Sequence, residues 1–307
     1  PAQAARPVRA RAALRIQDGC DESCAFCVVP LVRGPARSVH AEVVLDRFNR
    51  LADQGAGEIV LTGIQTGAWG IDLDPPSALP DLLELLLSGT SRPRIRISSV
   101  EPQHLSGRLV DLLTTNGRVC PHLHVPIQSA SRRLMAAMGR PDGNRAASRI
   151  ERSLRRFPTL AVGFDVMAGL PTESDDDFAQ TTALLERLPL AYLHVFTYSP
   201  RTGTRAPSLA PRVPERVAVL RTRELLRIDE RLRRAYRRSL VGRAAEVVVE
   251  SIGADGSIRG TTERFVPAVI VGVGAAPGAI VHGTIESVSA EGVARVVACD
   301  ASTPRVP

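Results

Sequence analysis

The sequence predicts an α/β fold: a partial (β/α)6 barrel followed by a small all-β barrel. Before residue 240, aliphatic strand-like runs alternate with longer helical runs in six β/α units, and such alternation favours a parallel sheet. After residue 240 the pattern changes to short β-branched runs separated by Gly and Pro, which is typical of small all-β modules. The apolar fraction of 44% is sufficient for a sizeable buried core.

The first three β/α units are predicted from short aliphatic runs, typified by EIVLT, each followed by an amphipathic stretch. The aliphatic runs predict strands at 14–17, 58–62 and 94–99. Apolar residues at helical spacing, ended by a glycine or an Asn-Gly pair, predict helices at 40–54, 79–87 and 105–115.

The next three units repeat this grammar. Strands are predicted at 122–127, 160–168 and 192–198. Helices are predicted at 132–138, 145–157, 175–188 and 213–240. The helix at 175–188 begins with acidic residues, which the helix dipole favours, and the last helix is long and rich in arginine. In a barrel of this kind, ligands are expected at the mouth formed by the carboxyl ends of the strands.

The final module is predicted from five β-branched runs. They lie at 244–249, 257–262, 265–273, 279–289 and 293–298, and a Gly-Ala-Asp-Gly turn joins the first two. Small barrels of this size often bind oligonucleotides, although a generic β-module is an equally simple interpretation. The expected organisation is a linker at 1–12, a barrel domain at 13–240, a β-domain at 241–299 and a disordered tail at 300–307.

The charge of the chain favours an anionic partner. The formal net charge is +7, and all 39 basic residues are arginine. Arginine binds phosphate through a planar fork of donors, so nucleic acid is a natural partner, although such an excess is also compatible with an ordinary solvated surface. No apolar run is long enough to span a bilayer and no charged-then-apolar leader is present, so we expect a cytoplasmic protein without membrane contact.

Three cysteines near the start carry the strongest chemical signal. Cys20, Cys24 and Cys27 form a C-x3-C-x2-C run, and iron–sulfur clusters are held by thiolates gathered on such short loops. Because a [4Fe–4S] cluster has four irons, three cysteines leave one iron free for a ligand that is not a protein side chain. Zinc is the alternative, with His40 as a fourth ligand, but zinc sites usually contain C-x2-C pairs. A disulfide framework is disfavoured because the chain has five cysteines in 307 residues.

These features together carry a family resemblance. The matching stretches are RIQDGCDESCAFCVVPLVRGPARS, EIVLTGIQTGAWG, RIRISSVEP, HLHVPIQSASRRLMAAMGR, DVMAGLPTE and LHVFTYSPRTGTRA. The chain resembles the radical S-adenosylmethionine (SAM) tRNA methylthiotransferases, most closely the MtaB type that acts on threonylcarbamoyladenosine, and its β-module resembles the RNA-binding TRAM domain of that family. The resemblance covers about residues 13–298.

The resemblance implies a site at the barrel mouth. Cys20, Cys24 and Cys27 would hold a [4Fe–4S] cluster whose open iron chelates SAM. The implied SAM contacts are Phe26 beside the adenine, Gly63 and Gln65 in the turn after the second strand, Ser98, Ser99 and Glu101 after the third, and Gln128 after the fourth. Each polar residue among them also has a simpler interpretation as a strand-end cap or a turn former.

The resemblance also implies the chemistry and the partners. A 5′-deoxyadenosyl radical would take hydrogen from C2 of the modified adenosine in a tRNA anticodon stem-loop, with flavodoxin or ferredoxin as electron donor. Sulfur would come from a second cluster on an N-terminal domain with three more cysteines, and the chain is expected to begin in the linker after that domain. Its remaining cysteines, Cys120 and Cys299, are interpreted as ordinary small residues.

The sequence departs from the family pattern at two further positions. Ala130 and Thr172 stand where family members commonly have glycine. Two other functions stay open at this point: a single-cluster radical-SAM enzyme that performs a different reaction on RNA, and a non-enzymatic RNA-binding protein with a structural cluster.

Overall fold

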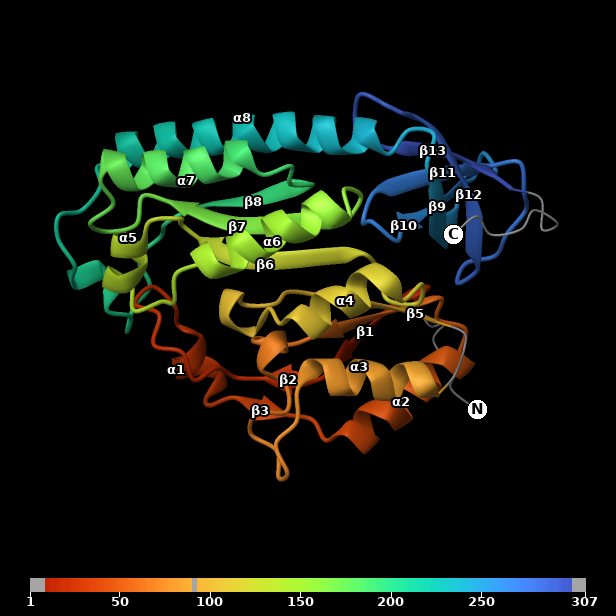
Figure 1. The fold of residues 1–307 in the computed structure, drawn as a ribbon, viewed down its shortest axis with the longest axis horizontal. Coiled ribbons are helices and arrows are strands. Elements are labelled where there is room, and N and C mark those ends of the chain that lie inside the picture. The colour runs from red at the N-terminus through yellow and green to blue at the C-terminus, as the bar shows by residue number, and fades with distance from the viewer. Residues whose placement is uncertain (1–8, 90–92, 300–307) are drawn as a thin grey trace.

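The computed structural model describes residues 9–89 and 93–299, and it contains the predicted partial barrel. Two three-stranded parallel sheets, with strand orders β1-β4-β5 and β6-β7-β8, lie side by side (Figure 1). A parallel bridge between Ile95 and Val119 and a hydrogen bond from Val100 to His124 connect the two sheets. The six strands therefore form one curved wall, as the alternation of elements predicted.

The bounds of the elements agree closely with the prediction. The part of the chain before residue 240, called the first unit from here on, contains the strands β1 (Arg11–Arg15), β2 (Gln17–Asp18), β3 (Arg37–Ser38), β4 (Glu58–Thr62), β5 (Arg94–Ile97), β6 (His122–Gln128), β7 (Ala161–Ala168) and β8 (Tyr192–Thr197). Its helices are α1 (Val29–Arg33), α2 (Ala41–Asp53), α3 (Leu79–Ser88), α4 (Gly107–Thr115), α5 (Arg132–Ala137), α6 (Asn144–Arg156), α7 (Asp175–Arg187) and α8 (Glu215–Ser239), with short 3-10 turns at Thr66–Ala68, Pro102–His104 and Ala206–Ser208.

The first strand differs from its predicted position at 14–17. It begins at Arg11, because Arg11–Arg15 pairs in register with Glu58–Thr62 and the Arg11 side chain bonds to Glu58. The last two residues of the expected linker thus belong to the sheet, and residues 1–8 lie outside the described part of the chain. The helix α1 and the two-residue strands β2 and β3 were not predicted, since segments this short carry no periodic signal.

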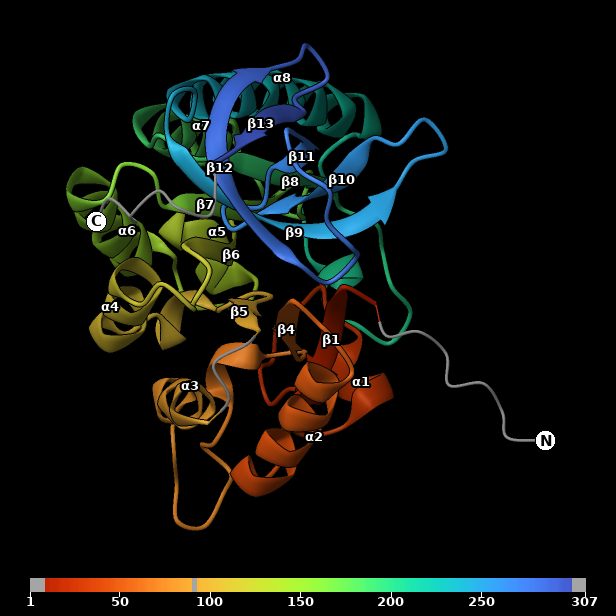
Figure 2. The ribbon, with the colours of Figure 1, turned by 90° about the vertical axis from the view of Figure 1, so that its right-hand side faces the viewer.

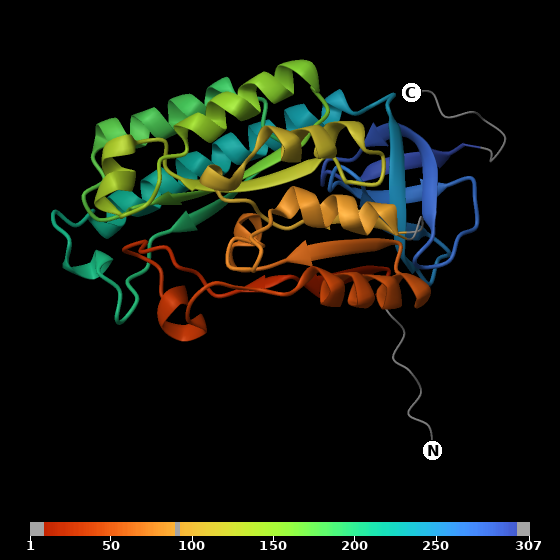
Figure 3. The ribbon, with the colours of Figure 1, turned by 60° about the horizontal axis from the view of Figure 1, so that its bottom comes forward.

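The helices lie along one face of the wall, its outer face (Figure 3). Alternating residues of each strand, such as Leu123, Val125 and Ile127, join the main apolar core between strands and helices. No helix in the described ranges is both long and apolar enough to cross a membrane. The long helix α8 buries Leu225 and Ile228 against the wall.

The C-terminal module is a closed five-stranded barrel, also as predicted. Its strands are β9 (Ala244–Ile252), β10 (Ile258–Thr262), β11 (Pro267–Val271), β12 (Ile280–Val288) and β13 (Ala294–Ala298), in the order β10-β11-β13-β12-β9. The barrel packs against the end of the wall where the parallel strands begin, opposite to α1 and α5 (Figures 1 and 2). The tail predicted to be disordered, 300–307, lies outside the described residues.

The first unit and the C-terminal barrel, or second unit, are joined by a shared apolar cluster and by hydrogen bonds from a buried arginine. Tyr192 and Tyr236 of the first unit pack in one apolar cluster with Val247 of the second. Arg94 donates to the backbone carbonyls of Glu246 and Thr261. The boundary near residue 240 is therefore a change of fold, and the two units are fixed to each other across it.

Candidate functional site at the mouth of the barrel

The three motif cysteines lie on one loop between β2 and α1, at the mouth of the barrel. Cys24 is buried, Cys20 and Cys27 are half-buried, and all three are free thiols. The sharp entry to this loop requires Gly19, whose φ is +73° and whose position would place a Cβ atom 1.9 Å from the carbonyl oxygen of Pro35. The left-handed backbone at Gly19 therefore sets the direction in which the loop leaves β2.

Residues that follow β6 and β8 in the chain pack against the cysteine loop and hold it in place. Ala25 donates its backbone N–H to Met138 at 2.7 Å and accepts from Ala206 at 2.8 Å. Its side chain lies in a small apolar cluster with Leu134, Met135, Met138, Leu170 and Ala206, and Phe26 packs against that cluster. The cysteine loop thus bridges the first strand and the region after β6, and holds Phe26 beside the three thiols, where the resemblance implies a contact to adenine.

The thiols lie in a desolvated but donor-rich environment. Burial raises the pKa of the Cys20 and Cys24 thiols, and the Arg140 guanidinium opposes the rise at Cys24, which it contacts at 3.4 Å. Backbone N–H groups of Glu22 and Val29 approach the sulfurs of Cys20 and Cys27 at 3.4 and 3.5 Å. Such donors stabilise thiolates, the form in which cysteine binds metal.

The geometry disfavours the zinc alternative. A single zinc ion with Zn–S bonds of about 2.3 Å would bring its ligand sulfurs within about 4 Å of one another. Among the described residues, the group of three metal-ligand types whose atoms all lie within 4.8 Å is His124, Asp165 and His194. The three sulfurs are therefore not gathered as closely as a single zinc ion requires.

The predicted turn after β4 is held against the cysteine loop by Gln65. Its side-chain oxygen accepts from the Cys20 thiol at 3.7 Å, and its amide group donates to Glu22 at 3.2 Å. Its backbone N–H donates at 2.8 Å to the side-chain oxygen of Gln17, which lies 3.0 Å from the Cβ position of Gly63. A side chain at position 63 would collide with Gln17, so Gly63 and Gln65 form one tightly packed turn.

The predicted residues after β5 border the same turn. The Ser98 hydroxyl lies 3.1 Å from that of Thr66, within hydrogen-bond distance, and half-buried Ser99 follows it. Glu101 is 7% exposed, and one of its carboxylate oxygens is buried without a hydrogen-bond partner. Burial raises the pKa of Glu101 to about 7, although the Arg140 guanidinium opposes the rise.

Gln128, at the end of β6, has the least ordinary backbone of the predicted residues. Its φ is +64°, a left-handed conformation that non-glycine residues adopt at a cost, and its side-chain oxygen is buried without a partner. Unpaired buried oxygens such as those of Glu101 and Gln128 need an explanation, and a polar ligand that supplies donors at the mouth is one. The residues present therefore fit a polar cofactor beside the cysteine loop.

Sequence reasoning missed three residues that organise this mouth: Gln17, Glu22 and Arg140. Gln17 is 1% exposed and donates to the carbonyl of Gly19 at 2.8 Å, which connects the cysteine loop to the Gln65 turn. Glu22 accepts from two glutamine side chains, and Arg140 links Cys24 to the carbonyl of Pro126. The position of Glu22 inside the cysteine motif was a usable signal, whereas Arg140 reaches the site only through tertiary folding.

Comparison with known proteins places these motifs in context. The model of the radical SAM superfamily matches residues 14–185. The chain is 35% identical over 243 residues to the threonylcarbamoyladenosine tRNA methylthiotransferase MtaB of Bacillus subtilis, covering 79% of this chain and 54% of that protein. It is 33% identical over 233 residues to the tRNA-2-methylthio-N(6)-dimethylallyladenosine synthase of Aquifex aeolicus, covering 76% and 53%. The chain thus spans about half the length of these curated relatives.

Solved structures agree on the fold. The coproporphyrinogen III oxidase HemN of Escherichia coli, a radical SAM enzyme, superposes with a TM-score of 0.55 at 15% identity, covering 84% of this chain and 66% of that one. At this identity the likeness concerns the fold alone.

Proposed function

The chain belongs to the radical SAM superfamily, and we propose that it is the catalytic and RNA-binding part of a tRNA methylthiotransferase of the MtaB type. Its substrate would be N6-threonylcarbamoyladenosine beside the tRNA anticodon. The observation that carries the proposal is the mouth itself, where three free cysteines on one loop face buried, unpaired oxygens of Glu101 and Gln128. The relatives named above are methylthiotransferases acting on such hypermodified adenosines.

The proposed cofactors are one [4Fe–4S] cluster, held by Cys20, Cys24 and Cys27, and SAM. When bound, these groups supply a carbon-centred radical able to remove the C2 hydrogen, a hydrogen too weakly acidic for a side-chain base. The loop between Gly19 and α1 presents the thiols, and Arg140 places a fixed positive charge beside Cys24. We assign the SAM contacts to Phe26, Gly63, Gln65, Ser98, Ser99, Glu101 and Gln128.

The protein's own contribution is orientation and exclusion of water. Gln17 and Gln65 lock two mouth loops together, so the thiols and the Gly63 turn keep a fixed separation. Gln128 ends β6 with a left-handed backbone, and its buried side-chain oxygen is left without a partner. Preorganised polar groups of this kind hold a cofactor without reorganisation at the moment of reaction.

The proposed RNA surface includes the β-barrel. A cavity of about 780 Å³ on this barrel is lined in part by Arg259, Ser251 and Ser289, which are suitable groups for a phosphate backbone, and by Arg295, which is paired with Glu286. The arginine-rich helix α8 offers less free charge than its sequence suggests. Four of its arginines are engaged by acidic neighbours, in the pairs Arg221–Glu173, Arg231–Glu186, Arg233–Asp229 and Arg234–Glu230.

A salt titration tests the RNA surface. The variant Arg259→Glu should bind an anticodon stem-loop more weakly, and should flatten the dependence of log affinity on log salt by about one unit. Arg234→Glu is the matched control, since that arginine is already paired with Glu230. An unchanged slope in Arg259→Glu would reject the β-barrel as the phosphate-binding surface.

Anaerobic reconstitution tests the catalytic proposal. Iron, sulfide and EPR analysis should give one [4Fe–4S] cluster per chain, and dithionite with SAM should then yield 5′-deoxyadenosine. A flavodoxin or ferredoxin is the proposed physiological electron donor, and a tRNA substrate implies a cytoplasmic setting. Stoichiometric zinc without iron uptake would reject the proposal, and a cluster that never cleaves SAM would favour a non-enzymatic RNA-binding protein.

A further inference from the structure

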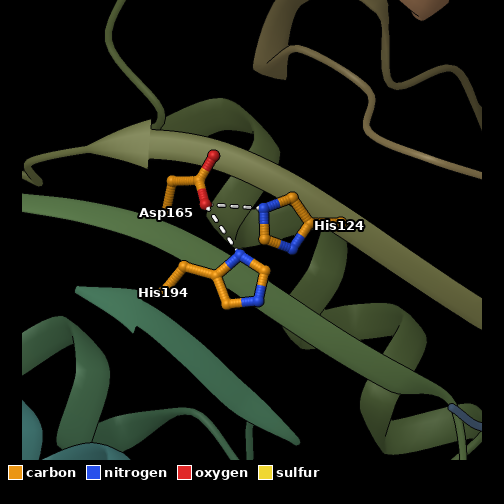
Figure 4. Close-up of side chains that lie close together, drawn as sticks. All are labelled: His124, Asp165 and His194. Atoms are coloured by element: carbon orange, nitrogen blue, oxygen red, sulfur yellow. Dashed lines mark hydrogen bonds and ion pairs between the residues drawn. The ribbon is translucent and has the colours of Figure 1, made fainter. Parts of the chain in front are cut away.

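A second polar cluster lies on β6, β7 and β8, on their inner face, which is the face opposite to the helices. It consists of His124, Asp165 and His194, one from each strand (Figure 4). Nε2 of His124 lies 2.8 Å from Oδ1 of Asp165, and Nδ1 of His194 lies 3.3 Å from the same oxygen. None of these side chains belongs to the cofactor site described above.

Hydrogen-bond directions in this cluster follow from Asp165. Although burial opposes it, hydrogen bonds from His124 and His194 lower the pKa of Asp165 to about 2, so its carboxylate only accepts. With Asp165 as acceptor, His124 donates from Nε2, and in that tautomer its Nδ1 accepts from the Tyr192 hydroxyl at 3.0 Å. Tyr192 in turn accepts from Nε2 of His122 at 2.8 Å, leaving Nδ1 of His122 as the buried atom without a partner.

This assignment gives each of the four contacts between His122, Tyr192, His124, Asp165 and His194 one donor and one acceptor without a metal ion. Burial lowers the pKa of His122 well below its usual range, which agrees with a neutral ring at the closed end. A tetrahedral zinc ion shared by the three side chains would hold their ligand atoms about 3.3 Å apart, which is wider than the 2.8 Å contact between His124 and Asp165. The cluster is thus an oriented hydrogen-bond chain that runs from buried His122 to His194.

His194 is the open end of this chain. Its side chain is 48% exposed, whereas those of His124 and Asp165 are 8% and 20% exposed. Because Nδ1 donates to Asp165, Nε2 is the ring nitrogen left free for a ligand. The ring is also fixed in place, since its centroid lies 4.7 Å from that of His124 and 5.1 Å from that of Tyr192.

The position of His194 along β8 suits contact with a substrate group that lies farther from the strand ends than the cofactor does. It precedes the end of β8 at Thr197 by three residues, or about 10 Å along the strand at about 3.3 Å per residue. In adenine, C2 and C6 belong to one ring and are separated by a single nitrogen. A base that presents C2 to the cofactor therefore keeps its N6 substituent on the same edge of the ring, close to the groups that surround the cofactor site.

We propose that His194 binds the carboxylate of the N6 substituent of the target adenosine, and that Asp165, His124 and Tyr192 position it for this role. This inference rests on the proposed function, because threonylcarbamoyladenosine carries that carboxylate. An imidazolium can donate from both ring nitrogens, so the substrate carboxylate at Nε2 and Asp165 at Nδ1 would hold one cation between two anions. His194 is then the residue that distinguishes this substrate from an adenosine without an anionic substituent.

The test measures discrimination by the reconstituted chain rather than activity. Three anticodon stem-loops of one sequence carry threonylcarbamoyladenosine, its methyl ester or plain adenosine, and competition anisotropy gives their relative affinities. The unsubstituted chain should prefer the free acid to the ester and to adenosine. His194→Ala should reduce that preference about tenfold, while His194→Gln, which keeps a donor, should retain part of it.

His282→Ala provides a matched control. His282 is 49% exposed and its Nδ1 lies 3.4 Å from Glu246, so it reproduces the exposure and pairing of His194 on the β-barrel. Its loss should leave the preference for the free acid unchanged. If the unsubstituted chain prefers the free acid and His194→Ala preserves that preference in full, the inference is wrong while the proposed function stands. If the unsubstituted chain binds all three RNAs equally, the substrate assignment itself is wrong.

Discussion

Glu58→Gln should strongly destabilise the protein, because it removes the anion at the centre of a buried ion cluster. The Glu58 carboxylate is completely buried and accepts from Arg11, Arg94 and Arg96 at 2.7–2.8 Å. The amide of glutamine has a single acceptor oxygen and turns an N–H₂ group toward a guanidinium. Two arginines that are each 2% exposed would then carry uncompensated charge in the interior.

The expected magnitude follows from the burial of all partners. Removing one member of a buried ion cluster typically costs about 3–5 kcal/mol, because the remaining charge stays desolvated. The loss should also loosen the contact between the two units, since Arg94 and Arg96 donate to the backbone of residues 246 and 261–263.

Urea unfolding monitored by fluorescence of Trp69 is the direct assay. Trp69 is the only tryptophan of the sequence, it is 1% exposed, and it lies in the first unit, so its signal reports loss of the barrel core. Glu84→Gln is the control, because Glu84 pairs with Arg108 at the surface and its substitution should shift the midpoint little. A Glu58→Gln variant whose free energy of unfolding falls by less than about 1 kcal/mol would refute this account of the cluster.

The dependence of stability on pH should also report on Glu58. Despite the desolvation that opposes it, the three arginines hold the pKa of Glu58 well below its usual range. A carboxylate with a depressed folded pKa contributes stability above its unfolded pKa of about 4.3, and that stability is lost as pH falls toward the folded value. The stability of the unsubstituted protein should therefore decline more steeply below about pH 4 than that of Glu58→Gln.

Three further outcomes are expected. Cys24→Ala should abolish cluster assembly, whereas Cys120→Ala and Cys299→Ala should leave the iron content and EPR signal unchanged. The 307-residue chain alone should cleave SAM but form no methylthio-adenosine by tRNA mass spectrometry, because its five cysteines include no second set of three; product formation would contradict our division of labour between two clusters. Thr172→Gly should raise the melting temperature, gaining roughly 1 kcal/mol, since Thr172 has a φ of +69° and a buried hydroxyl without a partner; a lower melting temperature would contradict this view of the site.

The sequence predicted the fold well because its local signals agree with the global arrangement. In the run EIVLT the prediction reproduced β4 at both ends, since buried aliphatic residues and flanking polar turns mark the same boundaries. The cysteine loop was equally predictable, because three thiols spaced along eight residues can serve few other purposes. Both features depend on residues that are neighbours in the sequence, so they can be predicted without knowing the tertiary fold.

The buried polar groups could not be predicted in the same way. The sequence pattern places Glu58 in a buried strand, but no residue near it in the sequence indicates that its partners are Arg11, Arg94 and Arg96. His122 and His124 alternate along one strand, which does place them on one face, but the partners Asp165 and His194 lie on other strands. Long-range pairing of polar groups depends on the sheet register, which the hydrophobic pattern of each strand fixes only in part.

The contact between the β-barrel and the strand wall connects the two proposed sites and decides which variants can test each of them. Phe265, from the turn between β10 and β11, packs against His122 with ring centres 4.9 Å apart and lies 6.1 Å from the ring centre of Tyr192, and the guanidinium of Arg96 lies 5.2 Å from the Phe265 ring centre. The β-barrel thus supplies the base on which the Tyr192–His124 chain rests. Removing residues 241–307 would take away that base along with the RNA surface, so a loss of binding could not be assigned to either. Surface substitutions such as Arg259→Glu separate the two effects, because they leave Phe265 and the shared core in place.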